Sequence, residues 1–162
     1  IGMLSQNTEA VRKLAHKADS LAKGIEVNSA MLNKNDNPMR VIEPLMKASD
    51  VFIVRPNTSL FNRLVAKLVL QLSMRYKTPV IGFSKNYAQA GALLSLYSSP
   101  ENTGLDMGNT VDRWIQSPER LLPAPSEGLH FSIVINYHIA KKMAIPVDVE
   151  MLTRELQIME GK

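Results

Sequence analysis

Three short polar segments follow predicted strands, and their side chains are suited to binding a small molecule. They are Ser5-Gln6-Asn7-Thr8, Pro56-Asn57-Thr58-Ser59 and Ser84-Lys85-Asn86. Each leads into a predicted helix, whose first N–H groups and positive dipole end attract a carboxylate or another anionic group. The alternative is that these residues only cap their helices. Because three such segments converge on one sheet edge, we expect a binding crevice there, formed by Ser5, Asn7, Asn57, Thr58, Ser59, Ser84 and Lys85.

The sequence lacks the residue combinations that catalysis and metal binding require. It has no Cys, no G-x-S-x-G sequence, and neither a G-x-G-x-x-G nor a P-loop glycine pattern. Its three histidines, His16, His130 and His138, are not spaced as metal ligands. We therefore expect no catalytic residue, no metal and no cofactor, and we interpret the histidines as surface or packing residues.

The composition indicates one globular domain, a single α/β lobe over residues 1–162. The 45% hydrophobic content is sufficient for a core. The longest apolar runs, residues 51–54 and 65–72, are far shorter than the roughly 18–20 residues of a membrane span, so none is expected. The net charge of +4 is scattered and the few aromatic residues are not interleaved with basic runs, which argues against a nucleic-acid partner. Since Ile1 already stands in a strand-like segment, we expect excision or processing from a longer protein.

Residues 51–97 determine the predicted fold class. They read as strand VFIVRPN, helix LFNRLVAKLVLQLSMRYK, strand TPVIGFSK and helix NYAQAGALLSLY. In the first of these helices we expect Leu60, Leu64, Leu68 and Leu72 to form one apolar row, widened by Val65 and Val69. A strand, a helix and a second strand at this spacing form a parallel crossover unit. We predict an open, mainly parallel, doubly wound α/β sheet with helices on both faces, in which ligands bind at the carboxyl ends of the strands.

Further elements flank this unit on both sides. Before it we expect strand IGMLS, a helix over residues 9–23 closed by Gly24, an edge strand IEVNSAML, and a helix begun by Asn37-Pro38 that Pro44 kinks or delays. After it we expect a helix begun by Ser99-Pro100, a linker SPERLLPAPSEG, strand HFSIVINYH ending at Asn136, a short helix, and a final helix over residues 147–159.

Several runs together resemble a known family. They are ASDVFIVRPNTSLFNRL, TPVIGFSKNYAQAGALLSLY and HFSIVINYHIAKKMAI, in that order and spacing. They are similar to the substrate-binding proteins of ABC transporters, of the aromatic or branched amino-acid-like type with a periplasmic-binding-protein type I-like fold. The resemblance covers nearly all of the chain. It implies two α/β lobes that close on a small solute and deliver it to a membrane permease.

The resemblance further implies that this chain is the carboxyl-terminal lobe only. Residues 98–128 then form a crossover or linker to a missing first lobe. The apolar residues 93–115 then lack the first lobe as their packing partner. We hypothesise that a second copy of the chain or a rearrangement buries them. By position, Asn7, Asn57, Thr58 and Ser84 match family binding loops, whereas Lys85 stands where the family often has Glu. That difference favours an anionic ligand over an amino acid if Lys85 faces the crevice.

The leading hypothesis is a non-catalytic solute-binding lobe of an ABC importer, located in the periplasm or outside the cell. Its expected partners are a small solute, such as an amino acid or a small carboxylate, and an ABC permease. Two alternatives use a similar fold: the ligand-sensing domain of a regulator or receptor, and a flavodoxin-like enzyme domain. An adjoining DNA-binding or kinase segment favours sensing, and a bound flavin or nucleotide favours the enzyme.

Overall fold

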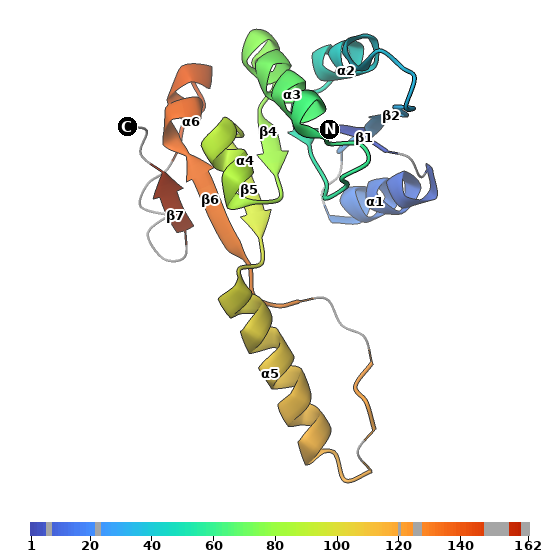
Figure 1. Ribbon diagram of the computed structural model, residues 1–162, viewed down its shortest axis with the longest axis vertical. Helices are drawn as coiled ribbons and strands as arrows, with labels where there is room; N and C mark the ends of the chain where they lie inside the picture. Colours follow the sequence, from blue (N-terminus) through green and yellow to red (C-terminus); the bar gives the residue numbers. More distant parts are fainter. Residues whose placement is uncertain (6–7, 22–23, 120, 125–127, 148–155, 160–162) are drawn as a thin grey trace.

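The residues that the structure describes form a seven-stranded sheet flanked by helices, with one long helix standing away from it (Figure 1). The computed structural model describes residues 1–5, 8–21, 24–119, 121–124, 128–147 and 156–159. The elements, in chain order, are β1 (Gly2–Leu4), α1 (Thr8–Leu21), β2 (Asn28–Ala30), α2 (Pro38–Lys47), β3 (Phe52–Ile53), α3 (Arg63–Tyr76), β4 (Val80–Gly82), α4 (Lys85–Ala90), β5 (Leu94–Tyr97), α5 (Pro100–Gln116), β6 (Ser132–Asn136), α6 (Tyr137–Met143) and β7 (Leu156–Met159).

The sheet confirms the predicted fold class. Its strand order is β2-β1-β3-β4-β5-β6-β7. The first five strands run parallel, β6 is antiparallel to β5, and β7 is parallel to β6. The chain passes from β1 outward to β2 and then returns to add β3 on the other side of β1. The strand order therefore reverses between β1 and β3, the place where open α/β sheets bind ligands.

The main core lies where α2 and α3 pack on the amino-terminal half of the sheet. Phe52 of β3 and Val80 of β4 are fully buried, as are Ile42 and Met46 of α2 and Val69 of α3. Burial on both faces explains why the residues around β3 read as a continuous apolar run. This core fixes the strand ends that carry the polar segments.

Helix α2 begins where its sequence predicts. The side-chain oxygen of Asn37 accepts a hydrogen bond of 3.0 Å from the Met39 N–H, and Pro38 is the first helical residue. Pro44 lies inside the helix, so the predicted late start is wrong. Apolar packing of Ile42, Leu45 and Met46 against the core stabilises the helix despite the missing proline N–H.

Helix α3 begins later than predicted. Its N-cap is Asn62, whose Oδ1 accepts from the N–H groups of Leu64 and Val65, so Leu60 precedes the helix. The predicted leucine row is wrong at Leu64, which is 79% exposed. The expected members Val65, Val69 and Leu72 are buried, so the face turned toward the sheet is centred on the two valines and not on Leu64.

Two predicted helices are wrong in part. The segment NYAQAGALLSLY divides at Gly91, whose φ of +123° ends α4, and its apolar second half is strand β5 between β4 and β6. Residues 156–159 of the expected final helix form β7, which pairs with β6, and residues 148–155 lie outside the described residues. A short apolar run does not distinguish strand from helix by its periodicity.

The remaining boundaries follow their sequence signals. Gly24 has φ +88°, as expected after α1, and Ser99 caps α5 with Pro100 at its first position. Asn136 ends β6 and caps α6, its Oδ1 accepting from the Ile139 N–H at 3.1 Å. In the described part of the chain, no helix is both long enough and apolar enough to cross a membrane.

Candidate ligand-binding site

The polar segments after β1, β3 and β4 meet at one edge of the sheet. These strands are direct neighbours and run parallel, so their carboxyl ends point the same way. Ser5 follows β1, Asn57 follows β3, and Ser84 follows β4. Asn7 lies outside the described residues. Ser5, Asn57 and Ser84 therefore follow strands that end at the same edge of the sheet.

The loop after β3 is held in place by Asn57. Its Oδ1 accepts hydrogen bonds from the N–H groups of Ser59 and Leu60 at 3.0 and 3.1 Å, and its backbone carbonyl accepts from the Phe61 N–H at 2.9 Å. The side-chain oxygen is thus engaged within the loop. What Asn57 offers outside the loop is its Nδ2 group, a hydrogen-bond donor.

The capping alternative holds for the starts of α3 and α4. Ser84 is the N-cap of α4, and its Oγ accepts from the Tyr87 N–H at 3.3 Å. Asn62 occupies the N–H groups of Leu64 and Val65 in the same way. These backbone donors are therefore not free for an anion. The Ser84 hydroxyl can still donate its hydrogen.

A hollow of about 370 Å³ opens between the loops after β3 and β4, lined by Pro56, Asn57, Thr58, Phe61 and Phe83. Its size is in the range of small-molecule sites, which combine apolar walls with a few polar groups. Phe61 and Phe83 were not among the predicted site residues. The signal was present, because Phe83 directly follows β4 and Phe61 closes the turn that Asn57 caps, but polar residues alone were considered.

The Phe83 ring packs against Tyr87. Their ring centroids are 5.1 Å apart, with the planes inclined by 47°. Tyr87 approaches β4 closely because residue 82 is glycine: a Cβ there would lie 2.6 Å from the Tyr87 Cβ. Burial raises the pKa of the Tyr87 phenol, so this side chain is neutral at physiological pH. Tyr87 therefore contacts Phe83 as an uncharged aromatic side chain.

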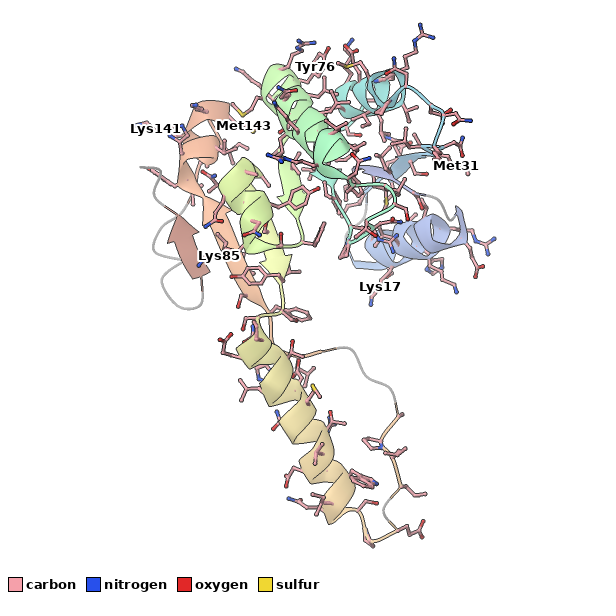
Figure 2. The ribbon with its side chains drawn as sticks, viewed as in Figure 1. Lys17, Met31, Tyr76, Lys85, Lys141 and Met143 are labelled. Carbon is pink, nitrogen blue, oxygen red and sulfur yellow. The ribbon has the colours of Figure 1, made fainter. Side chains whose placement is uncertain are left out.

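The other predicted residues differ in access. Ser5 is buried, and Thr58 and Ser59 are exposed. Lys85 is exposed in the first turn of α4, and its side chain extends on the side of α4 that faces β6 (Figure 2). The structure thus groups Asn57, Thr58 and the two phenylalanines around the hollow, and it leaves Lys85 on the flank away from the loop after β3.

No charged side chain is among the described residues that line the hollow. Residues 54–62 and 83–86 contain Arg55 and Lys85 and no Asp or Glu, and Arg63 begins α3 immediately afterwards. Among the described residues, no group of acidic or histidine side chains is arranged to hold a metal ion.

Helix α5 stands off the sheet and is fastened at its base (Figure 1). Asp106 accepts hydrogen bonds from the backbone N–H groups of Leu129 and His130 at 3.1 and 3.4 Å, and its Oδ1 lies 2.6 Å from Nδ1 of His130. The hydrogen bond from His130 lowers the pKa of Asp106. His130, interpreted from the sequence as a surface or packing residue, thus makes a side-chain hydrogen bond that ties the segment before β6 to α5.

Along its length α5 is uncovered. No residue of the helix is buried, and Met107, Val111 and Ile115 are 64%, 49% and 58% exposed. They recur every four residues and so share one face. Gly104 and Gly108 lie beside them, and a Cβ at either glycine would meet no atom within 4 Å. By contrast residues 94–97, expected to need a partner, are paired within the sheet as β5.

Residues 1–158 match the model of the ABC transporter substrate binding protein family. The chain belongs to this family. Among curated proteins, no sequence matches the chain significantly. The family match agrees with the resemblance that the sequence motifs carry, and it makes solute binding the role to be tested.

Solved structures share the fold. A conserved domain protein from Vibrio cholerae is 20% identical, with a TM-score of 0.67, and the match covers 96% of this chain and 54% of that one. An ABC domain in complex with L-Trp from Streptococcus pneumoniae is 16% identical (TM-score 0.65; 98% and 54% covered). A ligand-free, open substrate binding protein with adhesive properties from Clostridium difficile is 17% identical (0.69; 99% and 54%). The chain thus spans about half the length of these structures.

Proposed function

We propose that this chain is the solute-binding carboxyl-terminal lobe of an ABC importer substrate-binding protein. The observation that carries the proposal is the hollow at the carboxyl ends of β3 and β4, beside the strand-order reversal, in a chain of this family. Asn57, Thr58 and Ser84 supply hydrogen-bond donors, and Phe61 and Phe83 supply apolar surface. Ser5, Asn7, Ser59 and Lys85 remain proposed contacts of the same edge. The lobe binds and releases its solute without chemical change, and the complex is presented to a permease outside the cytoplasm.

A second α/β lobe completes the site in this proposal. The hollow is open on one side, and the related structures are nearly twice as long as this chain. Residues 98–128, which include α5, form the crossover, and the face with Met107, Val111 and Ile115 packs on the second lobe. The two glycines on that face permit close approach of another backbone. Burial of residues 93–115 by a second copy of this chain is the competing arrangement.

The test is a thermal-shift screen of the full-length gene product against amino acids and small carboxylates. A ligand that binds only the native state raises its stability by about 2.7 kcal/mol at 100 times its dissociation constant. We expect at least one compound to stabilise the protein in a concentration-dependent way. The neighbour in complex with L-Trp makes aromatic compounds the first to try. Failure of every compound, with the protein folded, contradicts a solute-binding role of this kind.

A further inference from the structure

We infer that a groove along the outer face of α3 binds an acidic, amphipathic helix of a partner protein. This surface is separate from the hollow at the strand ends, so the inference does not depend on the proposed function. Its basis is a long apolar recess whose lining includes cations that no described residue neutralises.

The groove lies over the helix layer that covers one face of the sheet. The connections through α2, α3 and α4 all lead in the same direction across the strand order, and right-handed crossovers place such helices on the same face. Helix α3 lies between α2 and α4 (Figure 1). Its outer face lines the groove together with Met39 of α2 and Ala90 of α4. The volume is about 820 Å³, against about 370 Å³ for the hollow at the strand ends.

Most of the lining is apolar. Its apolar members on α3 are Ala66, Leu68, Leu70, Leu72 and Met74. Met39 and Met74 are 36% and 37% exposed, and methionine side chains adapt readily to the shape of an apolar partner. Helix α3 has 14 residues and is therefore about 21 Å long. A groove of this length suits about four turns of a helix that lays its apolar face into it.

The charge of the groove selects an acidic helix. Arg63, Lys67 and Arg75 are part of its lining. Arg63 and Lys67 are one helical turn apart, and neither forms an ion pair or a side-chain hydrogen bond with any described residue. In the sequences of α2, α3 and α4 the one acidic residue is Glu43, which lies 3.1 Å from Nζ of Lys47 and also interacts with Arg75. Carboxylates one turn apart on a partner helix therefore meet two unpaired cations.

The shape of the groove favours a helix over an anionic membrane. Lipid headgroups also attract Arg and Lys side chains. A bilayer, however, presents a broad surface that covers a recess without filling it, and the apolar residues on α3 would then remain in contact with water. A helix fills the recess and buries them, and apolar burial is the main favourable contribution to such binding.

The test uses the full-length gene product and a synthetic helical peptide of the same length as α3, with one leucine stripe flanked by Glu residues. Fluorescence anisotropy should show saturable binding that weakens as salt is added. Lys67→Glu should weaken it about five- to tenfold, because attraction becomes repulsion. Met74→Gln should weaken it about two- to fivefold, because apolar contact is lost. Arg12→Glu, at an exposed position of α1, should leave the affinity unchanged, and a scrambled peptide of the same composition should not bind.

Each contrary result overturns the inference. Equal binding of the scrambled peptide, or equal effects of Arg12→Glu and Lys67→Glu, shows attraction by net charge alone. Binding to phosphatidylglycerol vesicles without binding to the peptide assigns the surface to a membrane. Self-association that Lys67→Glu abolishes, again without peptide binding, assigns it to a second copy of the chain. Absence of all binding also refutes it. Should Lys67→Glu not fold by circular dichroism, Arg63→Glu takes its place. The solute screen tests the proposed function separately.

Discussion

Replacing Asn57 separates the two roles that the structure gives to this side chain. Asn57→Ala removes the two hydrogen bonds that Asn57 Oδ1 accepts from the N–H groups of Ser59 and Leu60. Loss of a capping side chain of this kind costs about 1 kcal/mol, within a range of about 0.5–2. Asn57→Asp keeps an oxygen acceptor at the same place, so its free energy of unfolding should stay within about 0.5 kcal/mol of the wild type.

Asn57→Asp should keep the stability of the wild type but lose affinity for an anionic solute. Asn57→Asp loses the Nδ2 donor and adds a negative charge beside the hollow, so an anionic solute should bind at least tenfold more weakly although the fold is intact. Urea denaturation monitored by circular dichroism gives the stability, and calorimetry with the solute found by screening gives the affinity. The reasoning is refuted if Asn57→Asp is as unstable as Asn57→Ala, or if it binds the anion as well as the wild type.

Three further substitutions test the supporting structure. Gly82→Ala places a Cβ against the rigid Cβ of Tyr87 and should lower the unfolding free energy by about 1–3 kcal/mol in urea titrations; a neutral effect contradicts the packing described. Asp106→Asn should lower the melting temperature near neutral pH, and the difference from wild type should shrink as pH falls below the ordinary Asp value of 3.8, because the pKa of Asp106 is lowered in the folded state. A pH-independent difference is the contrary result. Val111→Ser should destabilise the full-length protein by about 1–3 kcal/mol if a second lobe covers its face, while Leu105→Ser, on another face of α5, should change stability little; equal effects argue against that packing.

The sequence predicted most of the sheet and the edge that carries the polar loops, because both follow from local patterns. Buried strands such as the one around Phe52 are continuous apolar runs, and cap signals such as Asn37-Pro38 and Ser99-Pro100 act within one helical turn. Residues 94–97 were assigned wrongly because their strand state depends on pairing with β4 and β6, which no local pattern records.

The aromatic half of the candidate site was missed for a related reason. Phe61 and Phe83 are 22 positions apart in the sequence and read separately as ordinary core residues. Only the parallel pairing of β3 and β4 brings the loops that carry them to one hollow. Conversely, Lys85 looked like a binding residue because it follows a strand, but the direction of its side chain is set by the first turn of α4.

The most direct test of solute binding at this edge is the backbone amide spectrum of the full-length gene product during titration with its solute. Binding in the hollow should shift the amide signals of residues 57–61 and 83–84 first and most strongly. Signals of α6, at the opposite sheet edge, should move little. Saturable binding that shifts α6 and leaves the loops after β3 and β4 unchanged would contradict the account.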